Sequence, residues 1–156
     1  MPDVFLPGNL IRIKDFQFEN STTRDKYMFV LLKNDTVAYV ISSLTTSQNK
    51  MNVTARKTGC YYDNRVSTYF HFPANELIGS GDFYFDKDTF IFFRENVRKI
   101  DIADLLKYAD PQDPFAIATI GTLTTEGLKS LLVCVLNSTF TPVGMKAELM
   151  EFKDTL

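Results

Sequence analysis

Hydroxyl and cationic side chains gather around one predicted hairpin, residues 27–44, and form the most specific chemical pattern in the sequence. The second strand of this hairpin is apolar as far as Ile41 and is then followed by Thr45, Thr46 and Gln48. A strand that ends in hydroxyls and an amide presents donors and acceptors on a rigid support. Arg24 and Lys26 come just before the first strand. We therefore expect cations and hydroxyls to meet at one end of the hairpin.

A second group of candidate binding residues follows in the polar segment 48–65. Basic and aromatic side chains alternate there against a single acidic residue, Asp63; they are Lys50, Arg56, Lys57, Tyr61, Tyr62 and Arg65. Basic residues among aromatics suit single-stranded nucleic acid, because both phosphates and base faces are available to them. The alternative is a solvated loop that leads into an edge strand.

Composition narrows the partners and the architecture. The chain has 156 residues, of which 45% are hydrophobic and 23% charged, as is typical of a globular protein of one domain, or one domain with an appendage. The formal net charge of −2 argues against broad electrostatic attraction to nucleic acid. Any contact with phosphates must therefore come from a local cluster of cations.

Metal, cofactor and membrane sites are not expected. The chain has two cysteines, Cys60 and Cys134, and one histidine, His71, so a zinc site is improbable and no cofactor is predicted. We expect two reduced, packed thiols and a structural histidine. The N-terminus lacks the features of a signal peptide, and no apolar run approaches the roughly 20 residues that span a bilayer. These features predict a cytoplasmic protein with no membrane partner.

The elements that must position these residues are mainly strands. Alternating or β-branched runs predict strands at 10–18, 27–32, 37–44, 67–72, 82–85, 89–93 and 97–100. Residues 19–25 are predicted to be a mobile polar loop, and Asp101 a cap for a helix at 102–108. The fold class is thus mainly β, a small antiparallel domain over residues 1–109 with one closing helix.

Beyond a predicted linker at 110–114, residues 110–156 are predicted to form a helical C-terminal extension. Thr124 or Thr125 can cap its first helix, and residues 145–153 form a second one. The first helix carries a broad apolar stripe of Leu128, Leu131, Leu132, Val135 and Leu136. Such a stripe must be buried, either on the barrel of its own subunit or at a dimer interface, and we favour the dimer interface.

Four segments, in order, make residues 7–108 resemble the MazF/PemK family of toxin endoribonucleases. Residues 7–13 resemble the family's opening strand, 26–31 the strand after its first loop, 40–50 the strand that ends in an Ile-Thr step, and 86–101 the closing strand with its tail. The resemblance implies an SH3-like (MazF/PemK/CcdB-type) antiparallel barrel that pairs into a two-fold homodimer.

The resemblance also implies an activity. Family members are toxins of type II toxin–antitoxin systems, and they cut single-stranded RNA without a metal. The 2′-hydroxyl attacks the adjacent phosphate and leaves a cyclic phosphate and a 5′-hydroxyl, which requires proton transfer and a cation to stabilise the developing charge. Thr45 matches the family's threonine, and either Arg24 or Lys26 stands for its arginine.

The remaining RNA contacts are expected from Thr46, Gln48, Lys50, Arg56, Lys57, Tyr61 and Tyr62. The implied partners are single-stranded RNA and an antitoxin protein. The alternative function is a non-catalytic barrel that binds RNA or a protein partner. Replacement of the family's arginine by lysine would favour this alternative, because lysine lacks the planar grip of a guanidinium on phosphate.

Overall fold

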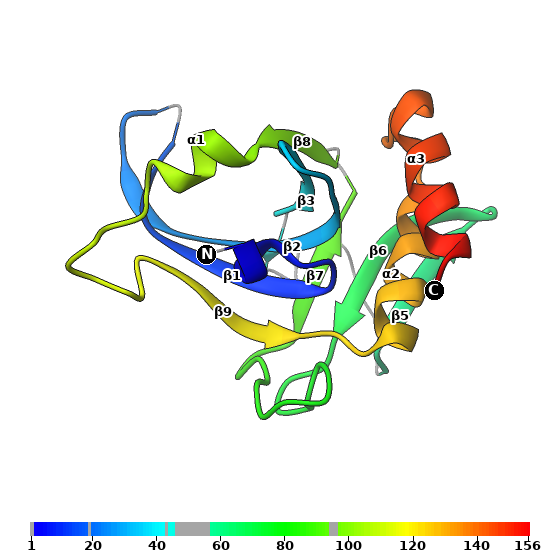
Figure 1. Cartoon of the computed structure of the whole chain (residues 1–156). Helices are drawn as coiled ribbons and strands as arrows, with labels where there is room; N and C mark the ends of the chain where they lie inside the picture. Colours follow the sequence, from blue (N-terminus) through cyan, green and yellow to red (C-terminus); the bar gives the residue numbers. More distant parts are fainter. Residues whose placement is uncertain (1, 19, 43, 46–56, 94–96) are drawn as a thin grey trace.

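The computed structural model describes residues 2–18, 20–42, 44–45, 57–93 and 97–156, and for Pro2, Asp3 and Thr45 this description covers the backbone alone. Within these ranges the chain is mainly β, with two antiparallel sheets and flanking helices (Figure 1). The strands are β1 (Asn9–Gln17), β2 (Thr23–Lys33), β3 (Val37–Ile41), β4 (Leu44–Thr45), β5 (Gly59–Asp63), β6 (Val66–Phe72), β7 (Thr89–Phe92), β8 (Arg98–Asp101) and β9 (Ile117–Thr122). The helices are η1 (Pro2–Phe5), α1 (Ile102–Leu106), α2 (Thr125–Leu136) and α3 (Val143–Asp154).

The predicted hairpin is confirmed as β2 and β3, at the centre of a five-stranded sheet with the order β8-β3-β2-β1-β9. Its turn is held by Asn34, whose side-chain oxygen accepts hydrogen bonds from the backbone N–H groups of Thr36 and Val37, both at 2.9 Å. β2 begins at Thr23, so Arg24 and Asp25 belong to this strand and not to the loop that the sequence predicted.

The two faces of this sheet pack against different partners, because side chains alternate along each strand. Met28 and Val30 point to one face, where they form a cluster with residues that include Leu105 of α1. Phe29 and Leu31 point to the opposite face, which is part of the main core. The five-stranded sheet thus has two faces, which we call the α1 side and the core side.

The second sheet has the order β4-β7-β6-β5. Two of its features differ from the sequence prediction. β5 lies in the segment that was open to interpretation as a solvated loop, and it forms the edge of the sheet. The predicted strand at 82–85 is not formed; a single bridge joins Leu77 and Tyr84 instead.

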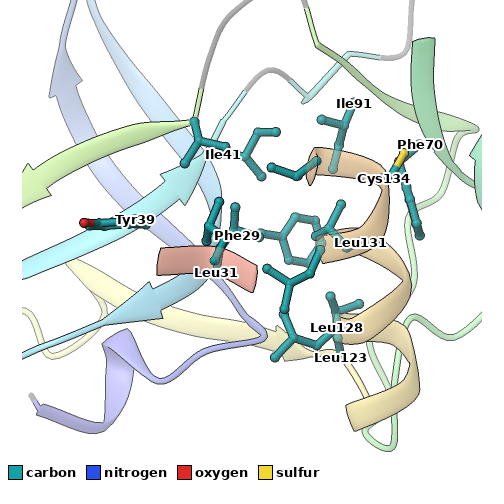
Figure 2. Packing of buried hydrophobic residues seen from close by; sticks show 14 of the residues in the cluster. Phe29, Leu31, Tyr39, Ile41, Phe70, Ile91, Leu123, Leu128, Leu131 and Cys134 are labelled. Atoms are coloured by element: carbon teal, nitrogen blue, oxygen red, sulfur yellow. The ribbon is translucent and has the colours of Figure 1, made fainter. Parts of the chain in front are cut away.

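Helix α2 is part of the core of its own chain. Its predicted start is confirmed, since the hydroxyl of Thr124 accepts a hydrogen bond from the N–H of Gly127 at 3.0 Å. Its apolar stripe packs with residues of both sheets, including Phe29 and Phe70 (Figure 2). Of the two docking sites that the sequence left open, the stripe thus occupies the one within its own subunit, where the two sheets leave an apolar surface, and not the dimer interface that we favoured.

Helix α3 packs on α2, and it is also tied to the first sheet. The hydroxyl of Tyr39 on β3 donates a hydrogen bond to the Glu148 carboxylate on α3. Burial of the phenol, together with this bond and the Glu148 charge, raises the pKa of Tyr39 to about 12.

Asp101 occupies the N-cap position of α1, although its side chain forms no capping hydrogen bond.

The prediction of reduced thiols is wrong, because Cys60 and Cys134 form a disulfide across 74 residues of chain. Pairing of β5 with β6 and packing of α2 beside these strands bring the two Cα atoms to 5.5 Å, a normal distance for this bond. The disulfide fastens the edge strand β5 to α2. No periodicity in the sequence reveals this proximity.

The region after residue 110 also contributes a strand. β9 pairs antiparallel with β1, and Ile13 lies opposite Ile117. Residues 110–156 are therefore integrated with the first sheet as well as with the helices, where the sequence predicted helices alone. Among the described residues, none of the helices has the length and apolar character that crossing a membrane requires.

Candidate nucleic-acid interface

The four-stranded sheet carries aromatic side chains on the face that points away from the main core. Along β6, Phe70 and Phe72 enter the core, so Tyr69 and His71, which alternate with them, point to the other side. Antiparallel pairing puts Tyr69 between Tyr61 and Phe92, and His71 beside Phe90. We call this surface the aromatic face; it consists of Tyr61, Tyr69, His71, Phe90 and Phe92.

Tyr61 and Tyr69 form the accessible part of the aromatic face. Their rings stack with centroids 4.9 Å apart and planes 11° from parallel, and both side chains are half-buried, whereas Phe90 and Phe92 are buried. Burial raises the pKa of Tyr69, and the neighbouring Tyr61 adds to this effect. The Tyr69 hydroxyl is therefore protonated at neutral pH and adds no negative charge that would repel a phosphate.

The backbone of Lys57 is held at the edge of the aromatic face. The Tyr61 hydroxyl donates to the Lys57 carbonyl at 3.0 Å, and it lies 3.4 Å from the Lys57 N–H that donates to it. The Lys57 side chain is exposed. The geometry thus joins two predicted RNA-binding residues, Lys57 and Tyr61, at one place.

Thr45, the predicted catalytic threonine, has its backbone in the same sheet. It lies opposite Phe90, which in turn lies opposite His71. Residues directly opposite one another in an antiparallel sheet share a face. By register, the Thr45 position therefore belongs to the row that runs through Phe90 and His71.

Arg24 and Lys26 lie elsewhere. They alternate on β2 with the core-side residues, so they point to the α1 side of the five-stranded sheet with Met28 and Val30. There the Arg24 guanidinium lies 4.5 Å from the ring centroid of Phe18. The Lys26 ammonium lies 4.6 Å from the centroid of Phe16 and 5.1 Å from that of Phe18.

This arrangement separates the two halves of the predicted catalytic site. Phe16 also stacks on Tyr108, just after α1, with ring centroids 4.9 Å apart. The cations are thus in cation–π contacts on the α1 side, whereas the Thr45 position belongs to the sheet that packs against the opposite, core side.

Of the other predicted RNA-binding residues, four lie outside the described part of the chain, and Tyr62 lies within it. Thr46, Gln48, Lys50 and Arg56 lie outside the described residues. Tyr62 follows Tyr61 on the strand and pairs with Ser67, so it points to the opposite side of the sheet from Tyr61 and is 49% exposed.

Sequence reasoning missed Tyr69 as a candidate and treated His71 as structural. The alternation of Tyr69 and His71 with Phe70 and Phe72 was a usable signal, since it separates two faces of one strand. The contact of Tyr69 with Tyr61 depends on strand pairing, which that alternation does not supply.

The described residues also line a cavity of about 230 Å³ between β9 and the loop at 78–83. Its lining has one titratable side chain, Asp82, and shares no residue with the aromatic face. Among the described residues, His, Cys, Asp and Glu side chains do not gather in groups of three or more suited to a metal ion.

Comparisons with protein-family models, with curated proteins and with solved structures found no match to this chain.

Proposed function

We propose that this chain binds single-stranded RNA on the aromatic face and cuts it as a MazF/PemK-type, metal-independent endoribonuclease. The observation that carries the proposal is that Tyr61 and Tyr69, with the Lys57 backbone held beside them, share one face of the four-stranded sheet with the Thr45 position, which lies on the opposite edge strand. Stacking tyrosines and a lysine suit unpaired bases and phosphates, respectively.

In this proposal the two sheets correspond to the SH3-like barrel that the sequence resemblance implies. β3 belongs to the five-stranded sheet and β4, which follows it in sequence and contains Thr45, belongs to the four-stranded sheet, so the threonine lies close in sequence to the point where the chain passes from one sheet to the other. The toxin role, the two-fold homodimer and the antitoxin partner belong to the same proposal and come from the resemblance alone.

The proposed reaction needs a proton acceptor, a proton donor and a cation beside the phosphate that is attacked. Thr45 is the proposed polar group of this site. The resemblance assigns the cation to Arg24 or Lys26, which lie on the α1 side of the five-stranded sheet.

That separation favours a second candidate function, a barrel that binds RNA or a protein partner without cutting. The Arg24 and Lys26 side chains already contact Phe16 and Phe18. A phosphate bound beside Thr45 would then lack their charge, and binding could proceed without catalysis.

One experiment separates the two candidates. Purified protein is incubated with a long single-stranded RNA in EDTA, and the products are analysed for cyclic phosphate and 5′-hydroxyl ends. Cleavage with these ends supports the nuclease, and RNA binding without cleavage supports the binder. Cleavage that EDTA abolishes and magnesium restores refutes the metal-free mechanism.

Variants then assign the residues. Thr45→Ala, and at least one of Arg24→Ala and Lys26→Ala, should slow cleavage by about 10²–10³, the usual effect of losing one group that stabilises a developing oxyanion. Ser80→Ala, which removes an exposed hydroxyl on the 78–83 loop, is the control and should cut RNA at the wild-type rate.

The proposed site of action is the cytoplasm, where the Cys60–Cys134 pair would meet a reducing environment.

A further inference from the structure

His71 is buried in the aromatic face, and its ring contacts the backbone of Lys57. Its side chain is 1% exposed, and its ring stacks on Phe90 with centroids 4.7 Å apart. Its Nδ1 atom lies 3.0 Å from the carbonyl oxygen of Lys57. Because a carbonyl can only accept a hydrogen bond, Nδ1 carries the proton and donates it.

The same carbonyl oxygen also receives the hydroxyl of Tyr61 at 3.0 Å. A carbonyl has two lone pairs, so His71 and Tyr61 together use its full accepting capacity. Two side chains of the aromatic face therefore converge on one backbone atom of Lys57. This convergence fixes the start of the β5 segment relative to the tyrosine pair.

The second ring nitrogen of His71 is not satisfied in the same way. Nε2 is buried and has no hydrogen-bond partner among the described residues, and it lies 3.7 Å from the Asp88 carboxylate, within ion-pair distance if the ring is protonated. A buried nitrogen without a hydrogen bond has a desolvation cost that an apolar residue of similar shape would avoid. A histidine at this position is therefore explained by its polar contacts, of which the Nδ1 bond is the shorter, and not by packing alone.

We infer that His71 is a positioning residue of the proposed RNA interface and acts through the Lys57 carbonyl. This inference rests on the proposed function. His71 does not touch the RNA. It holds the Lys57 backbone, and with it the Tyr61 hydroxyl, so that a phosphate-binding side chain and a base-stacking ring keep a fixed separation. Affinity for single-stranded RNA then depends on a hydrogen bond that the RNA does not contact.

Two substitutions of His71 distinguish the loss of the Nδ1 hydrogen bond from the loss of the imidazole ring. In His71→Asn the amide nitrogen comes close to the position of Nδ1, whereas in His71→Gln the amide nitrogen reaches about as far as Nε2. Only the asparagine variant can restore the bond to Lys57. Tyr61→Phe removes the second donor to the same carbonyl and keeps the ring, so it tests the same carbonyl even if His71→Gln folds poorly.

The first readout is the dissociation constant for a short fluorescein-labelled 2′-O-methyl RNA of mixed sequence, which cannot be cut because the attacking hydroxyl is blocked. Loss of one net hydrogen bond should weaken binding about three- to tenfold in His71→Gln and in Tyr61→Phe. His71→Asn should bind within about twofold of the wild type. Equal weakening in His71→Asn and His71→Gln overturns the inference, and so does wild-type affinity in all three variants.

The second readout needs no RNA. Trypsin cleaves after Lys57, and the carbonyl of that peptide bond is the atom that His71 and Tyr61 hold. Cleavage at this bond, followed by mass spectrometry, should be about three- to tenfold faster in His71→Gln and unchanged in His71→Asn. Unchanged cleavage in His71→Gln and Tyr61→Phe refutes the anchor itself. If the anchor responds as expected but the wild type binds no RNA, the proposed function fails, and the positioning role falls with it.

Discussion

The disulfide between Cys60 and Cys134 provides a perturbation of stability whose size follows from the structure. Replacing both residues, as Cys60→Ser with Cys134→Ala, removes the cross-link while a small side chain remains at the buried position 134. The cross-linked positions are 74 residues apart in sequence. We expect the free energy of unfolding to fall, because the unfolded chain has a higher conformational entropy without the cross-link.

The size of this effect follows from the length of the closed loop. The chain-entropy relation gives a loss of about 4.4 kcal/mol at 25 °C for a loop of 74 residues, within the range of about 2–5 kcal/mol found when native disulfides are removed. For a domain of this size each kcal/mol corresponds to about 2–4 °C, so the melting temperature should fall by about 9–18 °C.

The assay is urea unfolding of the wild type and the double variant, each with and without a thiol reductant. Reductant should lower the midpoint of the wild type to that of the double variant and leave the double variant unchanged. The slope of the transition should rise when the cross-link is absent, since the unfolded chain exposes more surface. The reasoning is refuted if removal of the cross-link costs less than about 1 kcal/mol. Free thiols in the wild type purified without reductant would remove its premise.

Two further predictions concern the packing around the core. Tyr39 has a pKa of about 12 in the folded chain against 10.0 in the unfolded chain, so its contribution to stability is complete below pH 10.0 and is lost as the pH rises toward 12. Urea midpoints across this range should therefore fall more steeply for the wild type than for Tyr39→Phe, by on the order of 2 kcal/mol, and parallel curves would contradict the assignment. A methyl group added at Gly79 would lie 1.7 Å from the carbonyl oxygen of Thr122, whereas one added at Gly81 meets nothing within 4 Å. Gly79→Ala should thus lower the free energy of unfolding by at least about 1–3 kcal/mol while Gly81→Ala has little effect, and equal melting temperatures for the two variants would contradict the close approach.

The sequence was sufficient to predict local structure that depends on nearby residues. The hairpin of β2 and β3 follows from two apolar runs around Asn34, whose short side chain hydrogen-bonds to the backbone two and three residues ahead. The start of α2 follows in the same way from Thr124. In both cases the residues that form the hydrogen bonds lie within a few positions of each other, so the turn and the helix start can be predicted without knowledge of the fold.

Features that depend on which surfaces meet were not predictable. The alternation of Lys26 with Met28 and Val30 puts them on one face, but only the fold shows that this face meets α1 and not the second sheet. The disulfide likewise depends on the packing of α2 beside β5. For the candidate site, the sequence proposed Tyr61, Lys57 and Thr45. It missed Tyr69 because the two-residue turn Asn64-Arg65, which joins β5 and β6 into a hairpin, was not recognised.

The most direct test of the central claim is to locate bound RNA on the protein by photo-crosslinking. Single-stranded RNA containing 4-thiouridine is irradiated in complex with the unmodified chain, and the crosslinked tryptic peptides are identified by mass spectrometry. The account predicts crosslinks in peptide 58–65, which contains Tyr61, or in the following peptide, which contains Tyr69. Crosslinks confined to peptide 15–24, which carries Phe16, Phe18 and Arg24, would place the RNA on the α1 side and contradict the account.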